Sequence, residues 1–166
     1  MMSAHNYYID STPKVSDVWF YSNLSDTTIT ADEWRTVLVC GLRKGGKHYF
    51  ALDVTDTSNP QYLWDFPHPV DPSISNYTDF LNTSLGQSWS EPAIGKVRIK
   101  QGSDLVDRWV AFIGGGYDPN QDNSPVVAAD TMGRVVYAVD LQTGAIVAVT
   151  LQGADHGDTT TLWKTM

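Results

Sequence analysis

Two stretches of the chain follow the same pattern, and this repeat limits the possible folds more than any other feature. The first covers residues 34–66, and the second covers residues 109–116 and then 133–149. Each stretch has a tryptophan, an apolar run, a glycine cluster and then an aromatic–Ala–aliphatic–Asp string. A recurring unit of this kind predicts supersecondary units packed side by side, as in a propeller or a solenoid. Such a scaffold more often binds than catalyses.

The composition is that of a β protein with a real core. Of the 19 acidic residues only Glu33 and Glu91 are glutamate, and Glu and Lys, the usual residues of exposed helices, are scarce, while Val and Thr are abundant. The hydrophobic fraction of 42% is sufficient for an apolar core, and the length of 166 residues predicts one domain.

Several classes of protein are excluded by charge and by hydrophobic pattern. A formal net charge of −8 argues against general nucleic-acid binding. No window approaches the roughly 20 apolar residues of a membrane span. The first ten residues, MMSAHNYYID, lack the basic and apolar regions of a signal peptide, and we expect both ends to be cut points in a longer polypeptide. Cys40 is alone, which excludes an internal disulfide.

Turn residues divide the chain into short segments of strand composition, which predicts antiparallel meanders. The glycines at positions 45 and 46 predict one hairpin turn, and residues 98–108 are interpreted as the polar end of another hairpin. Residues 89–99 are expected to lead into the second meander. Long loops are predicted near residues 67–88 and 116–132. Strands are predicted over residues 5–9, 15–21, 34–41, 48–54, 61–66, 109–114, 134–141 and 145–151.

Five strings occur in a characteristic order along most of the chain: HNYYIDSTP at 5–13, the meander at 34–64 with its ALDVTD segment, LGQSWSEP at 85–92, GGGY at 114–117 and VVYAVDLQTG at 135–144. Together they resemble the C-terminal domain of the PilC/PilY family of type IV pilus biogenesis factors and tip adhesins. The Ala-x-Asp…Thr-Gly element also occurs in quinoprotein-type propellers.

The resemblance implies a modified seven-bladed β-propeller, of which about two to three blades are present. We therefore interpret residues 1–166 as a single partial propeller unit of the all-β class, built from antiparallel meanders. A partial ring leaves sheet edges that loops, another chain or the rest of a parent polypeptide must cover, because open edges invite pairing.

Asp118, Asn120 and Asp122 form a D-x-N-x-D pattern within the second predicted loop. Alternate positions of a turning loop present three side-chain oxygens, and Ca²⁺ takes roughly six to eight oxygen ligands. The resemblance implies comparable Asp/Asn-rich calcium loops in this domain. Unlike an EF-hand, the loop has Asn123 at its sixth position and Ala129 at its twelfth. We predict a calcium site at the three residues, with a solvated polar loop as the alternative.

The other polar clusters are interpreted as structural, and no catalytic or cofactor-binding residues are predicted. Asp53, Asp56, Asn59 and Asp140 are expected to accept backbone hydrogen bonds in turns. The histidines have no i,i+4 spacing of a zinc site, and the glycines at 114–116 lack the context of a phosphate loop. The histidines are His5, His48, His68 and His156.

Tryptophan is frequent, with six residues in the chain. Recurrence in the repeat predicts that Trp34 and Trp109 lie in the core. An exposed Tyr or Trp within residues 67–89 is a candidate for a partner contact, although the sequence does not indicate which one.

We interpret the chain as a non-enzymatic fragment of a pilus-tip or pilus-biogenesis protein, located outside the cell at the pilus tip or outer cell surface. The resemblance implies roles in pilus assembly, in control of extension and retraction, and in adhesion, tuned by calcium. Expected partners are pilin or minor pilins, the remainder of the propeller or a complementary chain, and a receptor on a host or abiotic surface. Two alternatives stay open: a quinoprotein-like dehydrogenase propeller and a purely structural envelope scaffold.

Overall fold

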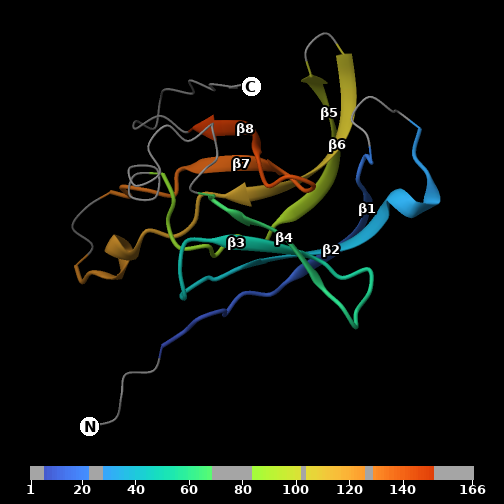
Figure 1. The fold of residues 1–166 in the computed structure, drawn as a ribbon. Coiled ribbons are helices and arrows are strands. Elements are labelled where there is room, and N and C mark those ends of the chain that lie inside the picture. The colour runs from blue at the N-terminus through green and yellow to red at the C-terminus, as the bar shows by residue number, and fades with distance from the viewer. Residues whose placement is uncertain (1–5, 23–27, 69–83, 102–103, 126–128, 152–166) are drawn as a thin grey trace.

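The chain folds into two four-stranded antiparallel sheets, each a meander in sequence order (Figure 1). A computed structural model describes residues 6–22, 28–68, 84–101, 104–125 and 129–151. The first sheet contains β1 (Lys14–Trp19), β2 (Trp34–Gly41), β3 (Tyr49–Asp53) and β4 (Gln61–Phe66). The second contains β5 (Ala93–Gln101), β6 (Asp104–Gly114), β7 (Val135–Asp140) and β8 (Ile146–Leu151). Two short 3₁₀ helices, η1 (Ala31–Glu33) and η2 (Pro119–Asp122), lie between strands.

The all-β class and the two antiparallel meanders are confirmed. β2 and β4 have the predicted bounds, and β1, β3, β7 and β8 overlap their predicted segments. Most of the predicted loop 67–88 lies outside the described residues. Within the predicted loop 116–132, the described residues include η2 but no strand.

One prediction of local structure was wrong, because residues 6–9 of the strand predicted over 5–9 belong to no strand. Residues 98–108 form the polar end of a hairpin as predicted, since β5 continues to Gln101 and pairs with β6, which begins at Asp104. The charged residues there pair across the strands, with Arg98 Nε 2.7 Å from Asp107 Oδ1, while Ile99 lies opposite Val106. Alternation of charged and β-branched residues along both strands is compatible with this exposed hairpin.

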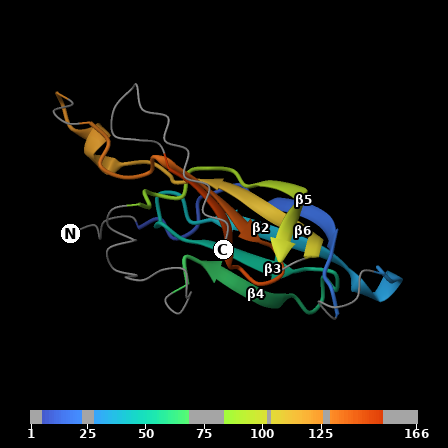
Figure 2. The same ribbon diagram turned by 90° about the horizontal axis from the view of Figure 1, so that it is seen from above.

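One apolar layer lies between the two sheets, which are stacked face to face (Figures 1 and 2). The first sheet contributes Val37, Val39, Tyr49, Ala51 and Phe66, among others, and the second contributes Ala111, Ile113, Tyr137, Val139 and Ile146. The rings of Phe66 and Tyr137 meet across the layer with centroids 5.2 Å apart. Each sheet thereby removes one apolar face from water, the dominant favourable term in folding.

Trp64 joins β4 to the turn between β7 and β8. Its indole Nε1 donates a 2.8 Å hydrogen bond to the carbonyl of Leu141. Gly144 in the same turn has φ +75°, and a Cβ there would lie 2.7 Å from Trp64 Cβ. The turn at Thr143 and Gly144 therefore requires glycine both for its left-handed backbone and for close approach to the tryptophan.

Backbone pairing defines the true equivalence of the two repeats. Val37 pairs with Asp53 in the first sheet, as Val110 pairs with Asp140 in the second. Counting back from these valines, Thr36 rather than Trp34 is the equivalent of Trp109. The prediction that Trp34 lies in the core was wrong, since its exposed fraction is 47%. Trp109 packs, partly buried, against the core as predicted.

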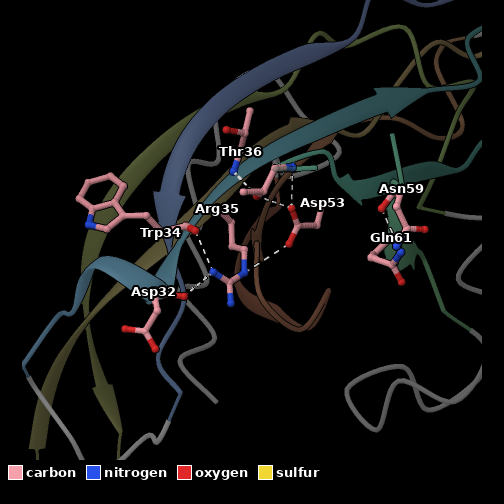
Figure 3. A network of polar contacts seen from close by, with 8 residues as sticks. Asp32, Trp34, Arg35, Thr36, Asp53, Asn59 and Gln61 are labelled. Carbon is pink, nitrogen blue, oxygen red and sulfur yellow. Dashed lines mark hydrogen bonds and ion pairs between the residues drawn. The ribbon is translucent and has the colours of Figure 1, made fainter. Parts of the chain in front are cut away.

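An arginine–aspartate pair recurs at equivalent positions in the two sheets. In the first sheet Arg35 Nε lies 3.3 Å from Asp53 Oδ2 (Figure 3). In the second, Arg108 Nε lies 3.6 Å from Asp140 Oδ2. Each aspartate also holds the turn that follows it, as predicted: Asp53 accepts from the N–H of Thr55, and Asp140 accepts from that of Gln142.

The segment 85–90, here called the strap, connects the two sheets by hydrogen bonds on both sides. Toward the second sheet, Gly86 N–H donates to the Gly115 carbonyl at 2.7 Å. Gln87 and Tyr117 exchange two backbone hydrogen bonds of 2.8 and 2.9 Å. Gly116, at φ +101°, permits this approach, because a Cβ there would lie 2.2 Å from the Gln87 carbonyl oxygen.

Ser88 fastens the strap to the turn between β2 and β3. Its hydroxyl oxygen accepts from the N–H groups of Leu42 and Arg43, both at 2.8 Å, and donates to the Gly46 carbonyl at 3.0 Å. The side chain is buried, with an exposed fraction of 1%. A buried polar group of this kind is favourable only while its partners are present.

Ser88→Ala should therefore reduce the free energy of unfolding by about 1–3 kcal/mol, because the partly buried N–H of Arg43 loses its Ser88 acceptor. Chemical denaturation of the purified chain measures the change. Ser58→Ala is the matched control, since Ser58 is exposed and its hydroxyl bonds only to the turn residue Asp56. Equal, small losses in both variants would contradict the role assigned to Ser88.

Glu33 is buried between the two ends of the segment that joins β1 to β2. Its carboxylate accepts from the Ser22 N–H at 2.7 Å and from the Thr30 N–H at 2.9 Å. The hydrogen bonds from Ser22, followed by those from Thr30, lower the pKa of Glu33 from 4.5 to about 2. Hydrogen bonds to the charged form favour ionisation, so the folded state holds this carboxylate in its anionic form.

Because this pKa is lower in the folded state, the stabilisation by Glu33 is fully present above pH 4.5 and is lost as the pH falls toward 2. We expect Glu33→Gln to destabilise the chain at neutral pH and the difference from wild type to shrink across that interval. Denaturation midpoints measured at several pH values test this. Glu91→Gln, which changes an exposed carboxylate, should show no comparable trend. A difference independent of pH would refute the assignment.

Candidate functional site

The candidate site is a groove on the strap side of the molecule, at the junction of the β2–β3 turn, the strap and the start of the β6–β7 connection. Its volume is about 390 Å³, and its lining residues are Lys44, Gln87, Trp89, Tyr117 and Asp122. We call it the Trp89–Tyr117 groove. Two of its lining residues, Gln87 and Tyr117, form the backbone bridge between the strap and the second sheet. The hydrogen bonds of that bridge therefore also fix the position of the groove.

Trp89 is the largest exposed group of the groove, with an exposed fraction of 44%. The guanidinium carbon of Arg43 lies 4.7 Å from its ring centroid, and the Tyr117 ring lies 5.9 Å away at a tilt of 59°. Its indole N–H donates to the Gln87 side-chain oxygen at 3.1 Å. Cation–π, aromatic and hydrogen-bond contacts together hold a large ring in a defined orientation at the surface.

Arg43, whose guanidinium lies over the Trp89 ring, has a strained backbone. It has φ +55°, in the left-handed region that non-glycine residues rarely adopt. Ser88 accepts its N–H, and its side chain donates to the Asp10 carbonyl at 3.2 Å while covering Trp89. Strained residues of this kind persist only where surrounding contacts determine them, and they cluster at functional sites.

Asp122 and Tyr117 form the polar wall of the groove. The Tyr117 hydroxyl donates a 2.7 Å hydrogen bond to Asp122 Oδ1. This bond, with burial and the nearby carboxylates, raises the pKa of the Tyr117 hydroxyl. Lys44 contributes a cation whose nitrogen lies 4.8 Å from the Tyr7 ring centroid. With an ammonium, an amide, a carboxylate and two aromatic rings, the groove suits reversible binding by stacking and hydrogen bonding.

Asp118, the first predicted calcium ligand, anchors the loop internally. It is buried at the start of η2, where its carboxylate accepts from the Asn120 N–H at 3.0 Å. The same carboxylate accepts from the N–H and the hydroxyl of Thr131 at 2.6 and 2.8 Å. Burial alone would raise its pKa, but these hydrogen bonds, with one from Met132, lower it overall. Asp118 thus ties together two parts of the loop that are distant in sequence.

The three predicted calcium ligands have different protein partners. Asn120 donates to the Ala129 carbonyl and accepts from Gln121, whereas Asp122 binds Tyr117. The described residues contain no group of three or more His, Cys, Asp or Glu placed to hold a metal ion. The three side chains therefore take part in separate hydrogen bonds within the loop, and the calcium site stays a prediction.

Of the other turn candidates, Asp56 caps its turn as predicted, because its side chain accepts from the Ser58 N–H at 2.9 Å. Asn59 takes part through its backbone, whose N–H donates to the Asp56 carbonyl and whose carbonyl accepts from the Gln61 side chain. His48 and His68 belong to no metal group among the described residues, and His5 and His156 lie outside them. Sequence reasoning missed the Trp89–Tyr117 groove, although it expected an exposed aromatic within residues 67–89. Trp89 is that residue among the ones described, and its neighbour Tyr117 lies in the GGGY string.

Comparison with known proteins agrees with the fold. Residues 1–159 match the model of the PilY1 beta-propeller domain family. The crystal structure of the Pseudomonas aeruginosa PilY1 C-terminal domain superposes with a TM-score of 0.55 at 28% identity, covering 92% of this chain and 24% of that one.

Curated relatives give the same result. The type IV pilus biogenesis factor PilY1 of Pseudomonas aeruginosa is 32% identical over 143 residues, which are 86% of this chain and 9% of the relative. A PilY1 homolog of Xylella fastidiosa is 33% identical over 128 residues, which are 77% of this chain and 8% of the relative. The chain thus spans less than a tenth of the length of either relative. With a family match over nearly its whole length and a fold similar to that of the solved domain, the chain belongs to the PilY1 β-propeller domain family.

Proposed function

We propose that this chain is the partner-binding propeller region of a type IV pilus biogenesis factor and has no enzymatic activity. Its relatives are named as pilus biogenesis factors. Because the chain spans only a small share of those relatives, roles in pilus extension, retraction and surface attachment are proposals about the whole protein. The family match does not favour the quinoprotein dehydrogenase alternative.

The single observation that carries the proposal is the Trp89–Tyr117 groove. Contact energy in protein interfaces concentrates in a few tryptophan, tyrosine and arginine residues held in a fixed orientation. Trp89 is such a residue, because Arg43 and Tyr117 restrain it while it stays 44% exposed. We infer that the groove contacts a pilin, a minor pilin or a surface receptor, at the pilus tip or outer cell surface. Among the described residues no helix is long and apolar enough to cross a membrane.

Trp89→Ala in the protein expressed by piliated cells should reduce surface attachment severalfold without lowering the amount of folded protein, because the main ring of the groove is lost. Counting attached cells and surface pili, with immunoblotting of the protein, measures the effect. Tyr62→Ala is the matched control, since it removes an exposed aromatic side chain from β4. Normal attachment and normal pilus numbers with Trp89→Ala would reject the groove and favour the purely structural scaffold.

Calcium control is a separate proposal, supported by the D-x-N-x-D pattern and the family resemblance. Asp122 is the informative ligand, because it is exposed and its loss leaves the Asp118 anchor intact. Calorimetric titration with Ca²⁺ should show saturable binding that Asp122→Ala abolishes, while the exposed turn variant Asp56→Ala binds normally. Unchanged Ca²⁺ binding in both Asp122→Ala and Asp118→Ala, or none in the wild-type chain, would remove the proposal.

A further inference from the structure

The arginine–aspartate pairs of the two sheets occupy equivalent positions but different surroundings. The backbone confirms the equivalence, because the Val54 N–H bonds to the Thr36 carbonyl at 2.8 Å and the Leu141 N–H bonds to the Trp109 carbonyl at 2.9 Å. The side chains of Arg108 and Asp140 are each only 7% exposed. Those of Arg35 and Asp53 are 36% and 17% exposed.

The pair of the second sheet is covered by residues 19–21, which lie at the end of β1 of the first sheet. We call these residues the plug. The guanidinium carbon of Arg108 lies 4.9 Å from the Tyr21 ring centroid. Gln142 Nε2 donates to the Tyr21 carbonyl at 2.9 Å, and the rings of Trp19 and Trp109 meet edge to face at 6.3 Å. One sheet therefore covers the ion pair of the next with an aromatic segment that follows its first strand.

The matching place on the first sheet is an open groove, here called the socket. Its volume is about 460 Å³, and Asp17, Trp34, Arg35, Thr36 and Thr55 line it. In Figure 3, Arg35 extends between Asp53 and the backbone of Asp32 and Trp34, to whose carbonyls it also donates.

Two differences between the sheets define what the socket accepts. Thr36 stands where the second sheet has Trp109, so the socket offers more room for a ring, and Trp34 stands beside it, half exposed. Thr55 stands where the second sheet has Gln142, and its hydroxyl donates to Asp53 rather than to a plug. The contact between a ring and Arg35 is therefore the main determinant of what the socket binds.

We propose that the socket receives a plug-like aromatic segment from an adjoining four-stranded sheet of the same propeller, with its ring over the Arg35 guanidinium. Trp19 and Tyr21 of this chain are already buried, at 9% and 8% exposure, so a second copy would have to withdraw its own plug to fill the socket. The solved PilY1 domain is also about four times longer than the matched region, because the chain covers 24% of it. Arg35 is thus a docking residue between sheets.

A labelled synthetic peptide with the sequence of residues 14–22, which contains β1 and the plug, tests the proposal. Fluorescence anisotropy with the purified chain should show saturable binding. Arg35→Gln should weaken it about tenfold, within the range of a partly desolvated cation–π contact. A peptide with Tyr21→Ser should bind comparably weakly. Arg98→Gln, which alters an exposed arginine paired with Asp107 on the second sheet, should leave binding unchanged.

Circular dichroism confirms that each variant is folded before its binding is compared. Lack of saturation, or equal binding by the wild-type and Arg35→Gln chains, overturns the proposal. Self-association of the wild-type chain that Arg35→Gln abolishes would assign the socket to a second copy and would overturn the assignment to an adjoining sheet. Trp89→Ala should bind the peptide normally, which separates this inference from the proposed role of the Trp89–Tyr117 groove.

Discussion

The apolar layer between the two sheets is the interaction on which the rest of the structure depends. A four-stranded antiparallel sheet alone leaves its apolar face in water, and here each sheet covers one face of the other. The layer also sets the position of the Thr-Gly turn, because Trp64 bonds to the Leu141 carbonyl and packs on Gly144.

The strap is hydrogen-bonded to both packed sheets and holds exposed side chains in fixed positions, which gives the molecule a surface that can bind a partner. Ser88 fixes it to the first sheet, while Gly86 and Gln87 fix it to the second. Trp89 is exposed between Ser88 and Ser90, and the Ser90 hydroxyl accepts the Gly114 N–H at 3.0 Å, so the ring of Trp89 lies on a fastened segment rather than on a free loop. Binding residues often lie on connections that a rigid scaffold positions, and the Trp89–Tyr117 groove has that organisation.

The repeat also explains how one sheet recognises the next. An arginine–aspartate pair fastens the turn after the third strand in both sheets, and an aromatic segment covers the second pair. A buried ion pair is costly unless its surroundings compensate for lost hydration. Tyr21 and Gln142 belong to those surroundings for Arg108 and Asp140, which makes the contact a means of alignment between sheets as well as of burial.

Local patterns in the sequence determined the strands, the turns and the family, because alternation, glycine positions and short strings depend only on neighbouring residues. They placed β2 and β4 correctly and identified the turn-capping roles of Asp53 and Asp140. They also predicted an exposed Tyr or Trp within residues 67–89, and Trp89 is such a residue among those described. Counting tryptophans failed for Trp34, since the hydrogen-bond register between strands defines equivalence.

Only the tertiary structure decided the burial of Asp118, the meeting of Trp89 with Tyr117 and the cover of Arg108 by Tyr21. Each joins segments that are separate in sequence, and the packing of the two sheets, with the strap between them, determines their distance.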